Sequence, residues 1–154
     1  MFYGERFEEA LKYAARLHRT QKRKGTNIPY VTHLLALAAI VGENGGTEDE
    51  VIAALLHDAV EDQGGAATRE EIRRRFGDTV AGIVGEVSDT DVVPKPPWRE
   101  RKETYVAQVR DAERSARLVS AADKLHNARS ILRDLRGEGD AVWRRFTGSK
   151  EETL

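Results

Sequence analysis

The stretch VIAALLHDAVED, from Val51 to Asp62, decides how the rest of the chain is interpreted. Its first six residues are all apolar, and a helix that is apolar on every side is a buried helix. Four ionisable residues follow, namely His57, Asp58, Glu61 and Asp62. On a continuous helix they spread over roughly 140° of one side, with His57 one turn from Glu61 and Asp58 one turn from Asp62. The sequence therefore predicts a buried helix whose end carries a cluster of ionisable groups.

These ionisable groups need compensation if they are buried with the helix. Burying polar groups without partners costs several kcal/mol, and burying charges costs more. A divalent cation would compensate this cost, because two carboxylates and an imidazole suit one. The alternative is an amphipathic helix whose polar end lies in water. We favour the cation because matching His and Asp residues recur elsewhere in the chain.

Length and composition bound the classes of protein that remain. The 154 residues predict one domain, and the 40% hydrophobic and 33% charged content is typical of a globular protein with a highly charged exterior. The net charge of −1 does not indicate a nucleic-acid or membrane binder. The absence of cysteine excludes disulfides and thiolate metal sites, and it agrees with a reducing, cytoplasmic location. The start MFYGERFEEA lacks the apolar core of a signal peptide, and no apolar run approaches the roughly 20 residues that span a bilayer.

The remaining chain is interpreted as helices joined by loops that contain Gly or Pro. Apolar positions predict helices over residues 2–20, 32–41, 98–110 and 113–136. Thr47 with Glu50 forms a capping box that opens the helix containing residues 51–62, and Thr68 with Glu71 forms another that opens a short helix ending at residue 76. Asp78 can cap the helix after that. No segment has the pattern of a strand, so we expect an all-α fold.

Two basic segments each have two interpretations. Lys22, Arg23 and Lys24 precede a glycine in the loop QKRKGTNIPYV. Such runs are usually solvated turns, and the alternative is the anion-binding edge of a pocket. Lys95 lies in the proline-rich segment SDTDVVPKPP, which we expect to be a mobile loop, and Lys102 follows in the next predicted helix. A basic loop at the mouth of a site could meet phosphates, and a solvated helix face is an equally good interpretation.

The last long predicted helix contains the segment ADKLHNARS. Asp123 lies among alanines and a leucine, so we expect it to point inward, and Asn127 lies one turn further along. A buried aspartate needs a partner, and a metal would serve. Taken alone, His18 and His33 are more typical of structural histidines than of ligands.

Taken together, His33, His57, Asp58 and Asp123 have the order found in the HD-domain metal-dependent phosphohydrolases: a histidine, a His-Asp doublet on a helix, and a distant aspartate. Two imidazole nitrogens and two carboxylate oxygens fit a six-coordinate first-row metal with water in the open positions. The chain resembles, more closely, the hydrolase domain of RelA/SpoT-type proteins and the single-domain small alarmone hydrolases. The resemblance extends from residue 10 to residue 135 through the segments QKRKGTNIPYVTH, AALLHDAVED, FGDTVAGIVGEVSD and ADKLHNAR.

The resemblance implies a fold, an activity and a cofactor. The fold would be an HD-domain helical bundle with a single buried metal site. The activity would be removal of the 3′-pyrophosphate from guanosine tetra- or pentaphosphate, giving GDP or GTP. Manganese would be the usual metal, with other first-row metals as alternatives. Relatives continue past a segment like FTGSKEETL into another helix, so we expect residues 1–154 to form a single hydrolase domain that lacks this helix. Its absence would either expose apolar surface near Trp143 and Phe146 or leave room for a homodimer partner.

The resemblance also assigns roles to residues. The metal ligands would be His33, His57, Asp58 and Asp123. Glu61 and Asp62 match the catalytic Glu-Asp pair of hydrolysing members. The residues that match substrate contacts are Arg23, Lys24, Asn127, Lys95 and Lys102. In this context the basic loop is interpreted as part of the nucleotide pocket.

Two other functions remain open at this point. The same kind of site can serve other phosphoesters, such as NADPH or a 5′-mononucleotide, because a fold does not fix a substrate. A sensor that binds a nucleotide without cleaving it is the second alternative. Relatives that lost activity typically lack the Glu-Asp pair, and this chain retains Glu61 and Asp62.

Overall fold

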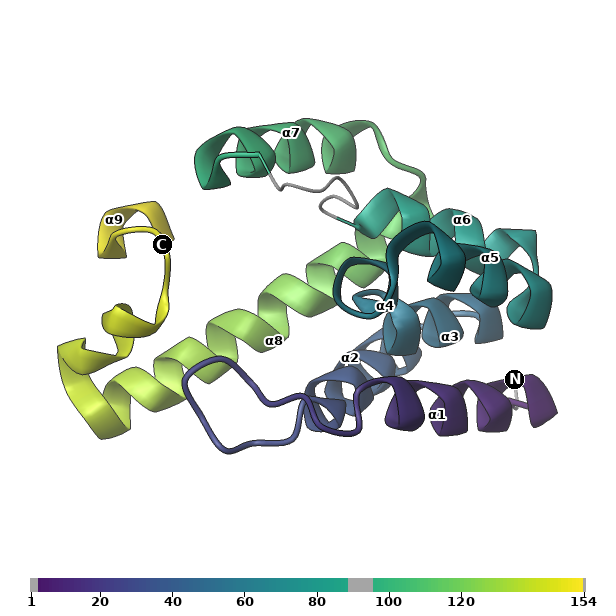
Figure 1. Cartoon of the computed structure of the whole chain (residues 1–154), viewed down its shortest axis with the longest axis horizontal. Coiled ribbons are helices and arrows are strands. Elements are labelled where there is room, and N and C mark those ends of the chain that lie inside the picture. Colours follow the sequence, from purple (N-terminus) through teal and green to yellow (C-terminus); the bar gives the residue numbers. More distant parts are fainter. Residues whose placement is uncertain (1–2, 89–95, 154) are drawn as a thin grey trace.

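A computed structural model describes residues 3–88 and 96–153 of the chain (Figure 1). The elements in chain order are α1 (Glu5–Leu17), α2 (Val31–Glu43), α3 (Glu48–Leu56), α4 (Ala59–Asp62), α5 (Gly65–Phe76), α6 (Asp78–Val87), α7 (Trp98–Asp111), α8 (Arg114–Glu138), the 3-10 helix η1 (Gly139–Arg145) and α9 (Lys150–Thr153). Within the described ranges there is no strand, and the β-type pairing is an isolated bridge between Lys22 and Pro29. The all-α prediction is confirmed.

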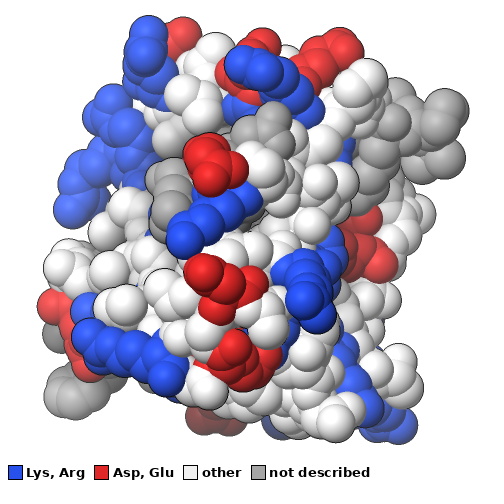
Figure 2. All heavy atoms as spheres, turned by 90° about the vertical axis from the view of Figure 1, so that its left-hand side faces the viewer, with Lys and Arg blue, Asp and Glu red and all other residues white. Residues whose placement is uncertain are grey.

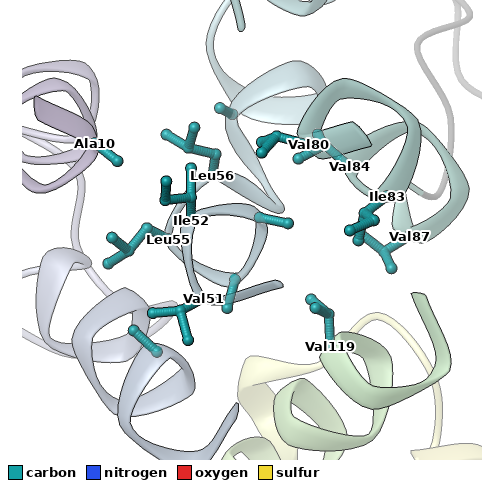
Figure 3. Packing of buried hydrophobic residues seen from close by; sticks show 14 of the residues in the cluster. Ala10, Val51, Ile52, Leu55, Leu56, Val80, Ile83, Val84, Val87 and Val119 are labelled. Atoms are coloured by element: carbon teal, nitrogen blue, oxygen red, sulfur yellow. The ribbon is translucent and has the colours of Figure 1, made fainter. Parts of the chain in front are cut away.

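Helix α3 lies at the centre of the hydrophobic core. Each residue from Val51 to Leu56 is at most 1% exposed, as the apolar run predicted. Figure 3 shows side chains of α3 directed toward Ala10 of α1, Val80 and Val84 of α6, and Val119 of α8. Helices α1, α2, α6 and α8 all contact α3. Full burial of one large aliphatic side chain contributes about 1.5–3 kcal/mol to the stability of the fold. Because α3 buries several such side chains against its four neighbours, it holds those helices in place.

The start of α3 is fixed by the predicted capping box. The Thr47 hydroxyl accepts a hydrogen bond from the Glu50 amide at 3.3 Å, and the Glu50 carboxylate accepts one from the Thr47 amide at 2.7 Å. Glu50 is buried, and its second oxygen accepts a hydrogen bond from Arg114 at the start of α8 at 3.2 Å. The cap therefore also ties α8 to α3.

The prediction of one continuous helix over residues 51–62 is wrong. Helix α3 ends at Leu56, His57 and Asp58 form a turn, and α4 follows. The imidazole Nδ1 of His57 lies 3.0 Å from the Ala54 carbonyl oxygen, which a continuous helix would pair with the Asp58 amide. Because Asp58 makes no side-chain cap for α4, its carboxylate is available on the inner side of the turn.

Two further cap predictions are also wrong. Helix α5 begins at Gly65, three residues before Thr68, because Gly64 and Gly65 adopt positive φ angles of 128° and 60° that start the helix earlier. The Thr68 hydroxyl instead donates to the Gln63 carbonyl at 2.7 Å. Asp78 is the first residue of α6 rather than its cap, and its carboxylate lies 3.1 Å from Arg73.

The longer helices differ from the predicted ranges only at their ends. Helix α1 is shorter than the predicted 2–20, α2 and α8 each extend beyond the predicted segments, and α7 nearly coincides with 98–110. The segment 89–95, where a mobile loop was predicted, lies outside the described residues. In the part of the chain that the structure describes, no helix combines the length and the apolar character needed to cross a bilayer.

Candidate metal centre and nucleotide pocket

Four side chains predicted as metal ligands converge from three parts of the fold. His33 lies in the first turn of α2, His57 and Asp58 form the turn after α3, and Asp123 lies on α8. The Nε2 atom of His33 is 3.3 Å from Oδ1 of Asp123, and Nε2 of His57 is 3.0 Å from Oδ2 of Asp58 and 3.9 Å from Oδ1 of Asp123. One donor atom each from His33, His57 and Asp58 lie within 4.8 Å of one another. Asp123 is not part of this three-residue group, although its Oδ1 lies close to both imidazoles. The spacing suits a single ion held by His33, His57 and Asp58, with Asp123 beside it.

The state of His57 fits a bound metal. Its Nδ1 faces the Ala54 carbonyl oxygen, an acceptor that holds a proton on that nitrogen and directs Nε2 into the site. Nε2 is buried, and it has no hydrogen-bond partner among the described residues although Asp58 is close. A buried nitrogen without a partner costs free energy, and a metal ion would remove that cost.

Neighbouring groups hold the two carboxylates. The Tyr30 hydroxyl donates a hydrogen bond to Oδ2 of Asp58. Asn127 donates to Oδ1 of Asp123 at 2.6 Å, and the ammonium of Lys124 lies 2.7 Å from its Oδ2. Partners of this kind orient metal-ligating groups in proteins.

The electrostatics of the site favour positive charge. Burial would raise the pKa of Asp58, but the charge of the adjacent His57 and the hydrogen bond from Tyr30 outweigh burial and lower it to about 2. Burial would likewise raise the pKa of Asp123, yet the neighbouring His33 imidazole and the charges of His57 and Lys124 hold it far below its ordinary value. Burial lowers the pKa of His57, and the two aspartates overcome this and raise it to about 9. Two ionised carboxylates therefore attract a cation, and a divalent metal competes there with the His57 proton.

The four groups line a cavity of about 310 Å³ that also contains predicted substrate-binding residues. The cationic and polar residues of its wall include Arg23, Lys24, Arg101, Lys102, Lys124 and Asn127. A second cavity of about 250 Å³ lies between the basic loop and α8 and shares Arg23, Lys24 and Asn127 with the first. Figure 2 shows one face of the molecule, where Lys and Arg alternate with Asp and Glu rather than forming one large basic field. Basic side chains therefore gather in the wall of this cavity, although the chain as a whole has a net charge of −1.

Comparisons with known proteins decide the family. Residues 10–152 match the model of the HD domain family. The chain belongs to this family. The chain is 41% identical over 128 residues to the guanosine-3′,5′-bis(diphosphate) 3′-pyrophosphohydrolases MESH1 of Xenopus tropicalis and Homo sapiens, covering 81% of this chain and 69% of each relative. The MESH1 of Drosophila melanogaster is 38% identical over 141 residues, covering 90% of this chain and 74% of that protein.

Solved structures show the same relationship. One, described as a metazoan ortholog of SpoT that hydrolyses ppGpp, superposes with a TM-score of 0.77 at 33% identity and covers 86% of this chain and 73% of that one. Another, from Listeria monocytogenes, gives a TM-score of 0.70 at 36% identity and covers 79% of this chain and 75% of that one. The resemblance to the HD-domain hydrolases that the sequence indicated is confirmed.

Within this HD domain, the predicted substrate-binding residues have different surroundings. The guanidinium of Arg23 donates to Oδ1 of Asn127 at 2.8 Å, so the basic loop is joined to α8 beside Asp123. Lys24 donates to the Thr147 hydroxyl at 3.4 Å, and Lys102 lines the cavity from α7. Lys95 lies outside the described residues. The roles of these residues remain predictions.

The two members of the predicted catalytic pair face different surroundings. Glu61 lines the cavity that contains the four candidate ligands. Asp62 is not among the lining residues, and its carboxylate accepts a hydrogen bond from the Gln21 amide at 2.7 Å. The Gln21 side chain is hydrogen-bonded in turn to the buried His18 at 2.6 Å and to Gln63 at 2.8 Å. His18 is thus buried, as expected of a structural histidine, and Asp62 connects α4 to the segment that follows α1.

Sequence reasoning assigned no role to three residues of the site, namely Tyr30, Lys124 and His126. Tyr30 precedes His33 by three residues and His126 follows Asp123 by three, so helical spacing could have placed these two beside candidate ligands. Lys124 directly follows Asp123, and adjacent helical residues do not face each other, so spacing gave no signal for it. His126 is half-buried, and burial, together with the charges of His33 and Arg23, lowers its pKa to about 4. It is therefore neutral near neutral pH.

Proposed function

We propose that this protein hydrolyses the 3′-pyrophosphate of guanosine tetra- or pentaphosphate, releasing pyrophosphate and leaving GDP or GTP. One observation carries the proposal: two imidazoles and two ionised carboxylates converge in a cavity whose other walls bear cations. The relatives that are 41% identical to the chain are named for this activity. The carboxylates can hold a metal ion, and the Lys and Arg side chains around them can bind the phosphates of a highly phosphorylated substrate.

We propose that His33, His57, Asp58 and Asp123 hold one divalent ion, with Mn²⁺ as the preferred metal. Two nitrogen and two oxygen donors suit a first-row divalent metal, and the unpartnered Nε2 of His57 supports its presence. When bound, such a metal supplies an acidified water and neutralises charge on phosphoryl oxygens.

The residues of the chain would perform the remaining work. Glu61, on the cavity wall, would orient the attacking water and take its proton. Asp62, through Gln21, would hold the short helix α4 that carries Glu61. The bond that breaks is the P–O bond at the ribose 3′ oxygen, and pyrophosphate leaves as a unit.

The cations and Asn127 would position the nucleotide. Arg23 can stack on the base plane, and Lys24 and Lys102 can act as point charges on phosphate. Asn127, joined to both Arg23 and Asp123, would contact the ribose and so link substrate position to ligand position. We assign Lys95 to the phosphate contacts on the basis of sequence alone.

We further propose that residues 1–154 act as one hydrolase domain in the cytoplasm, because α1, α2, α6 and α8 share one core around α3 and the chain has no cysteine. A homodimer remains a prediction from the resemblance.

The test is to incubate purified protein with Mn²⁺ and ppGpp and to measure GDP and pyrophosphate. We expect stoichiometric release of both, and a large loss in an Asp58→Asn variant. Release of single phosphate from NADPH or a mononucleotide, with ppGpp untouched, would replace the proposal with the second phosphatase function. Tight ppGpp binding without cleavage would identify a sensor, and equal rates for the wild type and the Asp58→Asn variant would remove the metal site from the mechanism.

A further inference from the structure

His126 is a histidine beside a candidate metal ligand that the proposed function leaves without a role. It lies on α8, half-buried, and its ring packs against that of His33 with centroids 4.9 Å apart. The Nδ1 atoms of the two rings are 2.8 Å apart. Two imidazole nitrogens at this distance share one proton, so one ring donates and the other accepts.

The direction of this hydrogen bond matters because His33 has a competing partner. On the opposite side of its ring, Nε2 lies 3.3 Å from Oδ1 of Asp123. A neutral imidazole carries a single N–H. If His33 carries its proton on Nε2, that proton points at Asp123 and occupies the direction in which a metal would bind. If it carries its proton on Nδ1, Nε2 presents a lone pair to the site.

We propose that His126 is a positioning residue that accepts the Nδ1 proton of His33 and thereby keeps Nε2 of His33 available to a divalent metal. This inference rests on the proposed metal site. His57 has the matching arrangement, since its Nδ1 faces the Ala54 carbonyl oxygen while its Nε2 faces the site. Each imidazole thus has an acceptor at Nδ1, supplied by the backbone for His57 and by a side chain for His33.

The fold makes His126 a well-placed acceptor. Asp123 and His126 are three residues apart on α8, so they project from neighbouring positions on one side of the helix. Helices α2 and α8 pack against each other, which brings His33 to both. An acceptor mounted on a rigid helix holds its partner more closely than one on a loop.

The test compares variants that differ in the hydrogen-bond acceptor at position 126. His126→Leu removes the acceptor while keeping an apolar body, and His126→Asn retains a carbonyl oxygen close to the position of Nδ1. Arg129→Leu is the matched control, because Arg129 is exposed on the same helix and lies outside the cavity lining. Circular dichroism during thermal unfolding establishes that each variant is folded.

The first readout is the dissociation constant for Mn²⁺ alone, measured by electron paramagnetic resonance of the free ion. Loss of a partner that orients a metal ligand weakens metal binding by about 10- to 100-fold. We expect this loss in His126→Leu, near-wild-type affinity in His126→Asn, and no change in Arg129→Leu. Equal affinity in His126→Leu and the wild type would overturn the inference and leave the proposed function intact.

The second readout needs no metal. Long-range ¹H–¹⁵N spectra of histidine-labelled, metal-free protein report which nitrogen of His33 carries the proton. We expect Nδ1 in the wild type and a shift toward Nε2 in His126→Leu. A wild-type His33 protonated on Nε2 would overturn the inference even if the protein binds Mn²⁺. A wild type that binds no Mn²⁺ but carries the His33 proton on Nδ1 would refute the metal proposal while supporting the hydrogen bond inferred here.

Discussion

Replacing Tyr30 with phenylalanine should weaken metal binding without disturbing the fold. The substitution removes one hydroxyl, which donates to Oδ2 of Asp58. Burial and the charge of Asp58 raise the pKa of Tyr30 far above its ordinary value, so the hydroxyl stays protonated and remains a donor across the accessible pH range. Without this donor, Asp58 keeps its contact with His57 at 3.0 Å and gains freedom to rotate.

Two magnitudes follow from this environment. A hydrogen bond to a charged group contributes about 1.5–3 kcal/mol. Asp58 has a side chain that is 25% exposed, so water can replace part of the lost contact and the unfolding free energy should fall by an amount near the lower end, about 1.5 kcal/mol. Metal affinity should fall by about 10- to 100-fold, the usual loss when an outer partner of a ligand is removed.

The assay is a titration of metal-free protein with Mn²⁺, alongside urea unfolding of the metal-free protein. Tyr13→Phe is the matched control, because it deletes the same hydroxyl from a half-buried ring that packs against Phe76, away from the site. We expect the control to bind Mn²⁺ as the wild type does. A Tyr30→Phe variant with wild-type Mn²⁺ affinity would refute the reasoning that Tyr30 orients Asp58.

Three other predictions test the core, the cap and the chemistry. Leu55→Ala in α3 should lower the unfolding free energy by about 2–5 kcal/mol in urea, because the side chain is fully buried and its loss leaves a cavity; a loss below that of an exposed Leu125→Ala control would contradict the central position of α3. Thr47→Ala should cost about 0.5–2 kcal/mol in the same assay through loss of the cap, and Thr47→Ser should restore most of it. Glu61→Gln should lower kcat for ppGpp by about 10²- to 10⁴-fold with unchanged Mn²⁺ affinity, because a general base is lost and the ligands remain; weakened Mn²⁺ binding would instead make Glu61 a ligand.

Local sequence pattern was sufficient where one strong signal decided the structure. Six consecutive apolar residues from Val51 predicted the buried helix, and Thr47 with Glu50 predicted its start. The convergence of the candidate ligands follows from the same helix: His57 and Asp58 sit at its end, and α2 and α8, which carry His33 and Asp123, pack against it.

The local sequence pattern did not predict the structure where two local signals competed, or where a partner distant in the chain determined the conformation. The predicted cap at Thr68 does not form, because α5 already begins at Gly65, where Gly64 and Gly65 have positive φ angles. Glu71 pairs with Arg74 and Arg75 instead of capping. No proline or glycine marks the break after Leu56, where the His57 ring lies against the Ala54 carbonyl oxygen of its own helix.

Side-chain partners across the fold were likewise not available from sequence. Asp62 is paired with Gln21, which is 41 residues away from it in the chain. The pairing of His126 with His33 depends on the packing of α8 against α2 over a separation of 93 residues. Sequence spacing brings such residues to a common helix face, but only tertiary packing selects their partners.

The most direct test of the central claim is anomalous diffraction from crystals of this protein grown with Mn²⁺. We predict one strong manganese peak within bonding distance of His33, His57, Asp58 and Asp123, and its loss in the Asp58→Asn variant. A manganese peak elsewhere, or none in crystals that bind the ion in solution, would contradict the account.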